Sequence, residues 1–192
     1  MKRPTANELL TVPNAISAAG FGMVITGSLR ADATEALTYT TVGRALDLVD
    51  GLTARALNQG SDFGAKVDAT LDKLGMAAIV SGGVYHARIP KPAAAVVIAH
   101  NALNAAASIT HEVRHPNEPA RPSKAGKVGL FIENVGVLSY LASEAIESQW
   151  PHSRTARSLK LAGHALTICG SGLGLIAGIG YVKRAAGQHT SV

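Results

Sequence analysis

The chain has 192 residues, of which 47 % are hydrophobic, and this length suits a single domain over residues 1–192. Its net charge of +5 does not indicate a nucleic-acid partner, because only 4 % of the residues are aromatic and the basic residues fall at the ends of apolar segments. Three runs without Asp, Glu, Lys or Arg are near or above the length that crosses a bilayer, which predicts an integral membrane protein: Pro13–Leu29, Ala93–Thr110 and Leu161–Val182.

The segment before the first run, residues 2–12, mixes charged residues with Leu and Val and predicts a short interfacial segment. Pro13 and Asn14, followed by Ser17, are typical of a turn and cap that start a helix, here the first span. Three further apolar segments are interrupted by charged residues, at 36–57, 64–87 and 128–146. We therefore expect an all-α, polytopic membrane protein with six transmembrane helices.

Charge at membrane depth is costly and usually faces a protein-lined or watery cavity, so the interrupted helices are those expected around a functional site. Glu133, in the fifth span, either orients a ligand there or pairs with a basic residue. In the fourth span, His100, Asn101 and Asn104 are of the kind that form hydrogen bonds across helices.

The last span repeats a small residue at every fourth position, Gly170, Gly174 and Gly178, which lets helices approach closely within a protomer or across a dimer. Cys169 is the single cysteine, so it cannot form an intrachain disulfide, and we expect a buried thiol. With six spans and a cytoplasmic start, twelve of the 18 Lys and Arg residues lie towards the cytoplasm, which supports that orientation.

Four aspartates stand in the second and third spans, spaced so that each pair shares one helix face: Asp47 with Asp50, and Asp68 with Asp72. The polar link between the spans contains Gly60, which predicts two antiparallel helices whose carboxylates converge near the cytoplasmic surface. Converging carboxylates repel, so either some are protonated or cations lie between them. Oxygen ligands without Cys or His favour Mg²⁺, Mn²⁺ or Ca²⁺ over zinc.

The complete spacing is D-x-x-D-G-x-x-A-R, eight residues, then G-x-x-x-D-x-x-x-D, and it is filled by Asp47, Asp50, Gly51, Ala54, Arg55, Gly64, Asp68 and Asp72. This pattern resembles the signature of the CDP-alcohol phosphatidyltransferase family at every position. The resemblance implies a membrane enzyme, in a bacterial cytoplasmic membrane, that transfers a phosphatidyl group from CDP-diacylglycerol to an alcohol and releases CMP. It also implies a homodimer.

The resemblance assigns roles to the motif residues. Asp47, Asp50, Asp68 and Asp72 would hold Mg²⁺ or Mn²⁺, two ions in all, and Asp72 would also be the general base that takes the proton of the attacking hydroxyl. The substrate-binding residues for the CDP-lipid would be Gly51, Ala54 and Gly64, where small side chains leave room for a ligand, together with Arg55. The Arg55 side chain either neutralises a phosphate or pairs with an aspartate.

The acceptor alcohol is indicated by weaker signals. The loop before the fifth span carries four basic residues that either bind an acceptor phosphate or form a solvated, positively charged loop: Arg114, Arg121, Lys124 and Lys127. The Asp72-Lys73 pair resembles phosphatidylglycerophosphate synthase members, which favours glycerol 3-phosphate. Inositol phosphate, a phospholipid acceptor and, from a different class, a divalent-cation transporter are the alternatives.

Overall fold

The computed structural model describes residues 11–57, 59, 62–114 and 123–185. These residues form six α-helices and no strand, which confirms the all-α prediction. The helices are α2 (Val12–Leu29), α3 (Ala33–Ala56), α4 (Asp62–Tyr85), α5 (Lys91–Arg114), α6 (Lys124–Gln149) and α7 (Arg154–Ala185). The expected interfacial segment lies outside the described residues apart from its last two, of which Thr11 caps α2 by accepting a hydrogen bond from the Asn14 backbone N–H.

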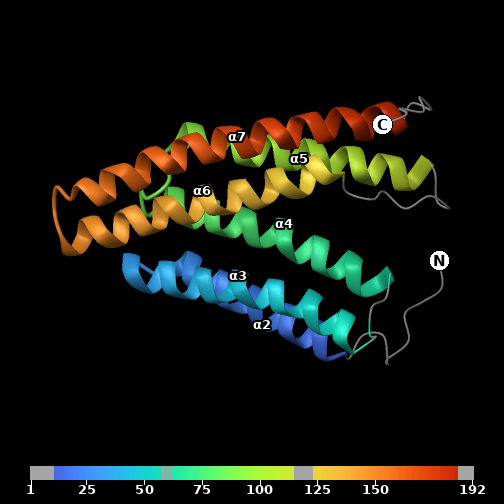
Figure 1. Ribbon diagram of the computed structural model, residues 1–192, viewed down its shortest axis with the longest axis horizontal. Coiled ribbons are helices and arrows are strands. Elements are labelled where there is room, and N and C mark those ends of the chain that lie inside the picture. Colours follow the sequence, from blue (N-terminus) through green and yellow to red (C-terminus); the bar gives the residue numbers. More distant parts are fainter. Residues whose placement is uncertain (1–10, 58, 60–61, 115–122, 186–192) are drawn as a thin grey trace.

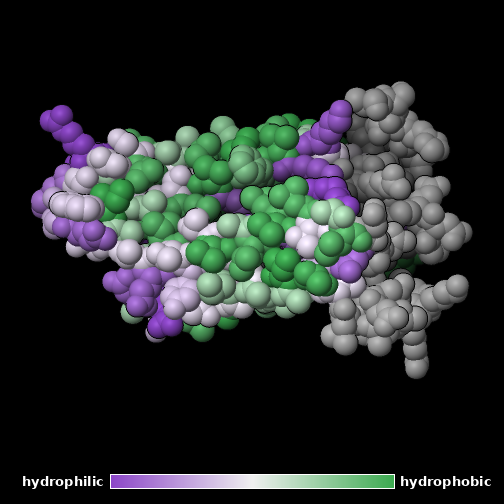
Figure 2. Space-filling view, turned by 60° about the horizontal axis from the view of Figure 1, so that its bottom comes forward, coloured by the Kyte–Doolittle hydropathy of each residue, from purple (hydrophilic) through white to green (hydrophobic). Residues whose placement is uncertain are grey.

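Three helices are long and apolar enough to cross a membrane, and each contains one of the uninterrupted apolar runs of the sequence. They lie within Val12–Leu29, Lys91–His111 and Arg154–Gly180. Among the described residues, α3, α4 and α6 do not meet the same requirements of length, hydropathy and charge. Figure 2 shows hydrophobic residues over the middle of one face and hydrophilic residues at its left end and beside the grey residues on its right.

The helices pack as two groups joined by α4 and α6. In Figure 1, α2 and α3 run side by side, and α5, α6 and α7 lie together above them. The most extensive contacts are those of α6 with α7 and of α2 with α3, and α4 packs mainly against α2. The end of α3, the start of α4, the end of α5 and the start of α6 lie towards the same end of the bundle (Figure 1).

Close contact between α2 and α3 depends on two facing glycines. A Cβ on Gly43 would meet the Gly20 carbonyl oxygen at 2.6 Å and the Val24 backbone nitrogen at 3.0 Å. A Cβ on Gly20 would meet the Gly43 oxygen at 2.9 Å. The two backbones therefore approach nearer than any side chain allows, which fixes the register of the helix that carries Asp47 and Asp50.

A buried polar network holds α5, α6 and α7 together. Glu133 of α6 is 0 % exposed and accepts hydrogen bonds from Asn101 Nδ2 at 2.9 Å and Ser171 Oγ at 2.8 Å. His100 Nδ1 lies 3.1 Å from Glu133 Oε1, without the alignment of a hydrogen bond. Asn104 donates to the Gly174 carbonyl at 3.0 Å. The cross-helix role expected for Asn101 and Asn104 is confirmed, and Glu133 faces His100.

The glycine repeat of α7 lies against its neighbours within the protomer. A Cβ on Gly170 would meet the Glu133 backbone nitrogen at 2.7 Å, and one on Gly174 would meet His100 Nε2 at 2.5 Å. The prediction of a buried Cys169 was wrong, since its side chain is exposed. Gly170 turns towards α6, and the preceding residue is rotated by about 100° on the helix, which carries Cys169 to the outer side of α7.

Candidate active site

Three of the four motif aspartates form a compact group. Asp47 and Asp50 come from the second half of α3 and Asp68 from the first half of α4, and one carboxylate oxygen of each lies within 4.8 Å of the others. Carboxylates at this separation repel by about 3 kcal/mol per pair at an effective dielectric constant of about 20. The expected convergence of these three residues is confirmed, although α3 and α4 touch each other only slightly.

The group is held from one side by α2. Asp50 is 4 % exposed and accepts a short hydrogen bond from Ser17 Oγ, which also contacts the Pro13 carbonyl oxygen at 3.1 Å. This hydrogen bond joins the most buried carboxylate, Asp50, to α2. The same helix packs against α3 and α4, which carry Asp47 and Asp68. Asp50 is therefore fixed in position, whereas Asp68 is exposed.

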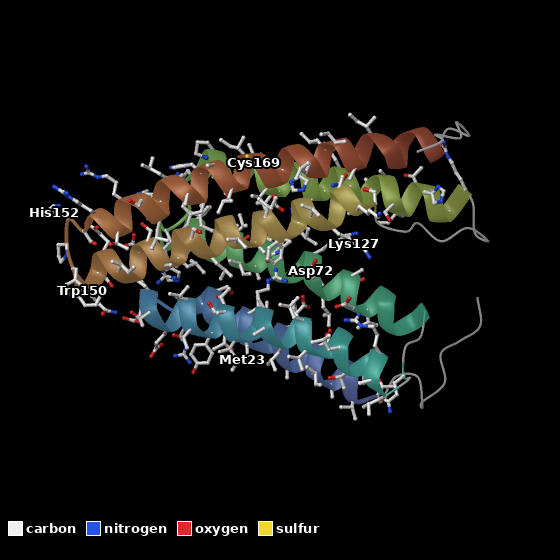
Figure 3. The ribbon with its side chains drawn as sticks, viewed as in Figure 1. Met23, Asp72, Lys127, Trp150, His152 and Cys169 are labelled. Carbon is white, nitrogen blue, oxygen red and sulfur yellow. The ribbon has the colours of Figure 1, made fainter. Side chains whose placement is uncertain are left out.

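The fourth aspartate has a different partner. Asp72 of α4 accepts a hydrogen bond at 2.5 Å from Arg44 Nη1 of α3, so that its side chain faces α3 (Figure 3). It remains near enough to Asp47 for their charges to repel, while Arg44 attracts Asp47. The four acids are thus close enough to interact electrostatically. Three of them converge, and the fourth is ion-paired with Arg44.

The donor set of the three-carboxylate group, defined by Asp47, Asp50 and Asp68, fits a divalent cation. All its ligand atoms are oxygens, which suit Mg²⁺, Mn²⁺ or Ca²⁺. Its geometry leaves the mutual repulsion of the carboxylates uncompensated unless a cation or protons lie among them. The residues present could therefore hold a divalent ion, and Asp72 stands beside that position.

The small motif residues on α3 leave open space. Of the described residues, only Arg55 would meet a Cβ on Gly51, with its Nη1 at 3.7 Å, so no other described side chain covers the helix surface beside Asp50. This contrasts with Gly43 on the same helix, which is in contact with α2. Ala54 is half-buried and Arg55 is exposed at the end of α3, and Gly64 lies at the start of α4. These four residues occupy the same end of the bundle as the aspartates.

Three of the four basic residues proposed for the acceptor are described, and Arg121 lies outside the described residues. Arg114 ends α5, and Lys124 and Lys127 are exposed in the first turn of α6, so these three residues lie on helices and not in the expected loop. Ser123 caps α6 by accepting a hydrogen bond from the Gly126 N–H at 3.1 Å. Figure 3 shows Lys127 at the start of α6 and Asp72 near the middle of α4. These three cations lie where α5 ends and α6 begins.

Two residues of the site, Ser17 and Arg44, are not indicated by the motif. Ser17 reads as part of a helix start, and its bond to Asp50 spans 33 residues between two helices, so no local spacing reveals it. Arg44 lies three residues before Asp47 on α3, and that spacing places it on the same face. The sequence offered Arg55 as a partner for either a phosphate or an aspartate, and the structure pairs one aspartate, Asp72, with Arg44.

A sequence profile of CDP-alcohol phosphatidyltransferase matches residues 6–169. The chain belongs to this family. The protein is therefore an integral membrane transferase that acts on a CDP-alcohol. Among the curated proteins, none matches the sequence of this phosphatidyltransferase. Its fold is similar to the crystal structure of phosphatidylinositol phosphate synthase from Mycobacterium tuberculosis with CDP-DAG bound, with a TM-score of 0.59 over 95 % of this chain and 92 % of that chain, at 15 % identity.

Proposed function

We propose that this phosphatidyltransferase transfers the phosphatidyl group of CDP-diacylglycerol to glycerol 3-phosphate and releases CMP. The observation that carries the proposal is the three-carboxylate group, because family membership and a site for a divalent ion coincide on the same motif residues. The bound CDP-DAG of the mycobacterial synthase, whose fold is similar, supports the same donor here.

Asp47, Asp50 and Asp68 would hold Mg²⁺ or Mn²⁺, with Asp72 completing a site for two ions. Bound there, the ions supply positive charge that offsets the charge developing on the pyrophosphate oxygens as the phosphoanhydride breaks. The chain itself contributes the orientation of the ligands, since Ser17 and the packing of α2 fix Asp50.

Asp72 is the general base of the proposed reaction. Its carboxylate accepts the proton of the acceptor hydroxyl as that oxygen forms a bond to the phosphatidyl phosphorus. The bond from this phosphorus to the bridging oxygen breaks, and CMP leaves with that oxygen. Gly51, Ala54 and Gly64 would lie against the cytidine and its phosphates, and Arg55, exposed at the end of α3, would neutralise a phosphate.

A phosphorylated acceptor fits the charge of this end of the bundle. Arg114, Lys124 and Lys127 lie there in the described part of the chain, and Arg121 belongs to the same basic stretch of sequence. The Asp72-Lys73 pair favours glycerol 3-phosphate over inositol phosphate.

We further propose that all six helices of this single domain cross the cytoplasmic membrane of a bacterium and that the protein is a homodimer. The helices other than α2 have 24 to 32 residues, and α2 has 18, so each reaches nearly or fully across a hydrocarbon core of about 30 Å. The excess of Lys and Arg on one side supports a cytoplasmic location for the aspartates, where glycerol 3-phosphate arrives from solution.

The acceptor is tested by following CMP release from CDP-diacylglycerol by purified protein with Mg²⁺ and one alcohol at a time. We expect release with glycerol 3-phosphate and little above background with inositol phosphate, inositol or no acceptor. Lys127→Gln should raise the KM for glycerol 3-phosphate about tenfold, the loss of one charged contact of about 1.5 kcal/mol. Faster release with inositol phosphate would instead assign the protein to the other branch of the family.

Ser17→Ala tests how the Asp50 carboxylate is held. The variant loses the hydrogen bond from α2, and we expect the Mg²⁺ concentration for half-maximal CMP release to rise about tenfold, the usual cost of losing a residue that orients a metal ligand. Ser28→Ala is the matched control, since Ser28 is on the same helix and, among the described residues, its hydroxyl bonds only to its own turn, at Ile25. An equal Mg²⁺ requirement in the two variants would contradict the assignment.

A further inference from the structure

Arg44 is a buried cation with hydrogen-bonding capacity to spare. Its side chain is 11 % exposed, and Nη1 donates to Asp72 Oδ1 at 2.5 Å. The Nε and Nη2 groups are buried and form no hydrogen bond within the described part of the chain. The guanidinium rests against the backbone of Gly75, where a Cβ would lie 3.6 Å from Nη2. Burying a guanidinium with unsatisfied donors is costly, so its position calls for a reason besides stability.

The charges around Arg44 supply that reason. Besides Asp72, with which it bonds, it attracts Asp47 one turn along α3. Four carboxylates without Arg44 carry four negative charges, which two divalent ions would neutralise completely. With Arg44 in place, one of those charges is already matched by the protein. Arg44 forms its ion pair with Asp72, the one motif carboxylate that lies outside the three-carboxylate group.

We propose that Arg44 is the positioning residue of Asp72: it occupies Oδ1, so that this carboxylate acts as a base through Oδ2 and completes the metal site with one oxygen at most. The proposal rests on the proposed function, in which Asp72 accepts the proton of the acceptor. The hydrogen bond engages Oδ1, and Oδ2 receives none from the described residues, so Oδ2 is the atom left to take the proton.

The proposal predicts opposite effects on metal binding and on turnover. Arg44→Gln removes a positive charge from beside the aspartates and frees Asp72 as a ligand, so substrate-free protein should bind Mn²⁺ about 3- to 10-fold more tightly. The ligand that the change frees is the second oxygen of Asp72, Oδ1, which then turns towards the ions. The base is misplaced as a result, and kcat for CMP release should fall about 10²-fold. A purely structural role would weaken both properties together, because a distorted site binds metal less well.

The experiment compares four proteins in detergent: wild type, Arg44→Gln, Arg44→Lys and the control Arg30→Gln. Arg30 forms an exposed ion pair with Glu35 at 3.5 Å at the opposite end of the helices, so its loss removes the same charge far from the site. Mn²⁺ affinity is measured by electron paramagnetic resonance without substrate, and turnover by CMP release. Arg44→Lys keeps the charge, and we expect it to bind Mn²⁺ like the wild type with kcat restored to within about tenfold.

A second set of variants tests whether Arg44 acts on turnover through Asp72. Asp72→Asn alone should lower kcat by at least about 10²-fold, and Arg44→Gln added to it should lower kcat no further, because the two residues act as one unit. Mn²⁺ affinity in Arg44→Gln that equals or falls below the wild-type value, or an unchanged kcat, would overturn the proposal. Absence of CMP release by the wild type with any acceptor would instead refute the proposed function, and the Mn²⁺ comparison would still decide the effect of Arg44 on the metal site.

Discussion

Asp50→Asn is expected to lower kcat for CMP release by at least about 10³-fold while the protein folds as the wild type does. Asp50 is the most buried member of the three-carboxylate group, so a water molecule cannot easily take its place as a metal ligand, and no other group in the described part of the chain supplies its negative charge. A metal ion that stabilises developing phosphate charge contributes several kcal/mol, and about 4 kcal/mol corresponds to a factor of about 10³ in rate.

The amide is chosen because it separates charge from structure. Ser17 Oγ donates to Asp50, and an Asn side chain offers a carbonyl oxygen in the same place, so the buried hydrogen bond survives and the negative charge does not. Removing one of several converging carboxylates also relieves about 3 kcal/mol of repulsion per pair, so thermal stability in the absence of metal should stay equal or rise.

The measurement pairs CMP release with metal-dependent thermal shift. Wild-type protein should gain stability as Mg²⁺ is added, since an ion that binds only the folded state stabilises it, and Asp50→Asn should gain little. Asp32→Asn is the matched control: Asp32 caps α3 at the other end of the helix, and Asn caps as well as Asp. Activity of Asp50→Asn within tenfold of the wild type would show that this carboxylate is not a metal ligand.

The sequence located the helices well because apolar runs, prolines and capping residues are local signals. It underestimated their length. The last uncharged run begins at Leu161, yet α7 begins at Arg154, because a helix continues into polar residues as long as its backbone hydrogen bonds are satisfied and the side chains reach water. Arg157 and Lys160 are exposed on these extra turns.

The candidate site was predictable to the extent that its residues form one motif. Asp47, Asp50 and Asp68 converge as their spacing indicates. The spacing does not predict the ion pair between Arg44 and Asp72, because Arg44 lies outside the motif. Which of the four nearby acids Arg44 pairs with depends on how α4 packs relative to α3. The hydrogen bond from Ser17 to Asp50 could not be predicted either, because it joins two helices and depends on their packing. The same holds for α4, which packs mainly on α2 and only slightly on α3.

Glu133→Ala is expected to cause the largest loss of stability of the substitutions considered, about 3 kcal/mol. The side chain is 0 % exposed and holds Asn101, Ser171 and His100 from two neighbouring helices. Hydrogen bonds between membrane helices average about 0.6 kcal/mol each, which alone would give roughly 1 to 2 kcal/mol. The larger figure follows because the partners are left buried and unpaired, and removal of one member of such a set costs about 3 to 5 kcal/mol.

A loss of this size should lower the midpoint of thermal unfolding in detergent by about 6 to 12 °C. Glu35→Ala is the matched control, because Glu35 is exposed and its ion pair with Arg30 is of the kind that contributes at most about 1 kcal/mol. Glu133→Gln, which keeps the shape and can still accept one hydrogen bond, should fall between the two. Mn²⁺ affinity should be the same in all three variants, since the partners of Glu133 lie on α5 and α7 and the metal ligands on α3 and α4. If Glu133→Ala weakened Mn²⁺ binding while unfolding at the wild-type temperature, Glu133 would belong to the site and not to the packing of the three helices.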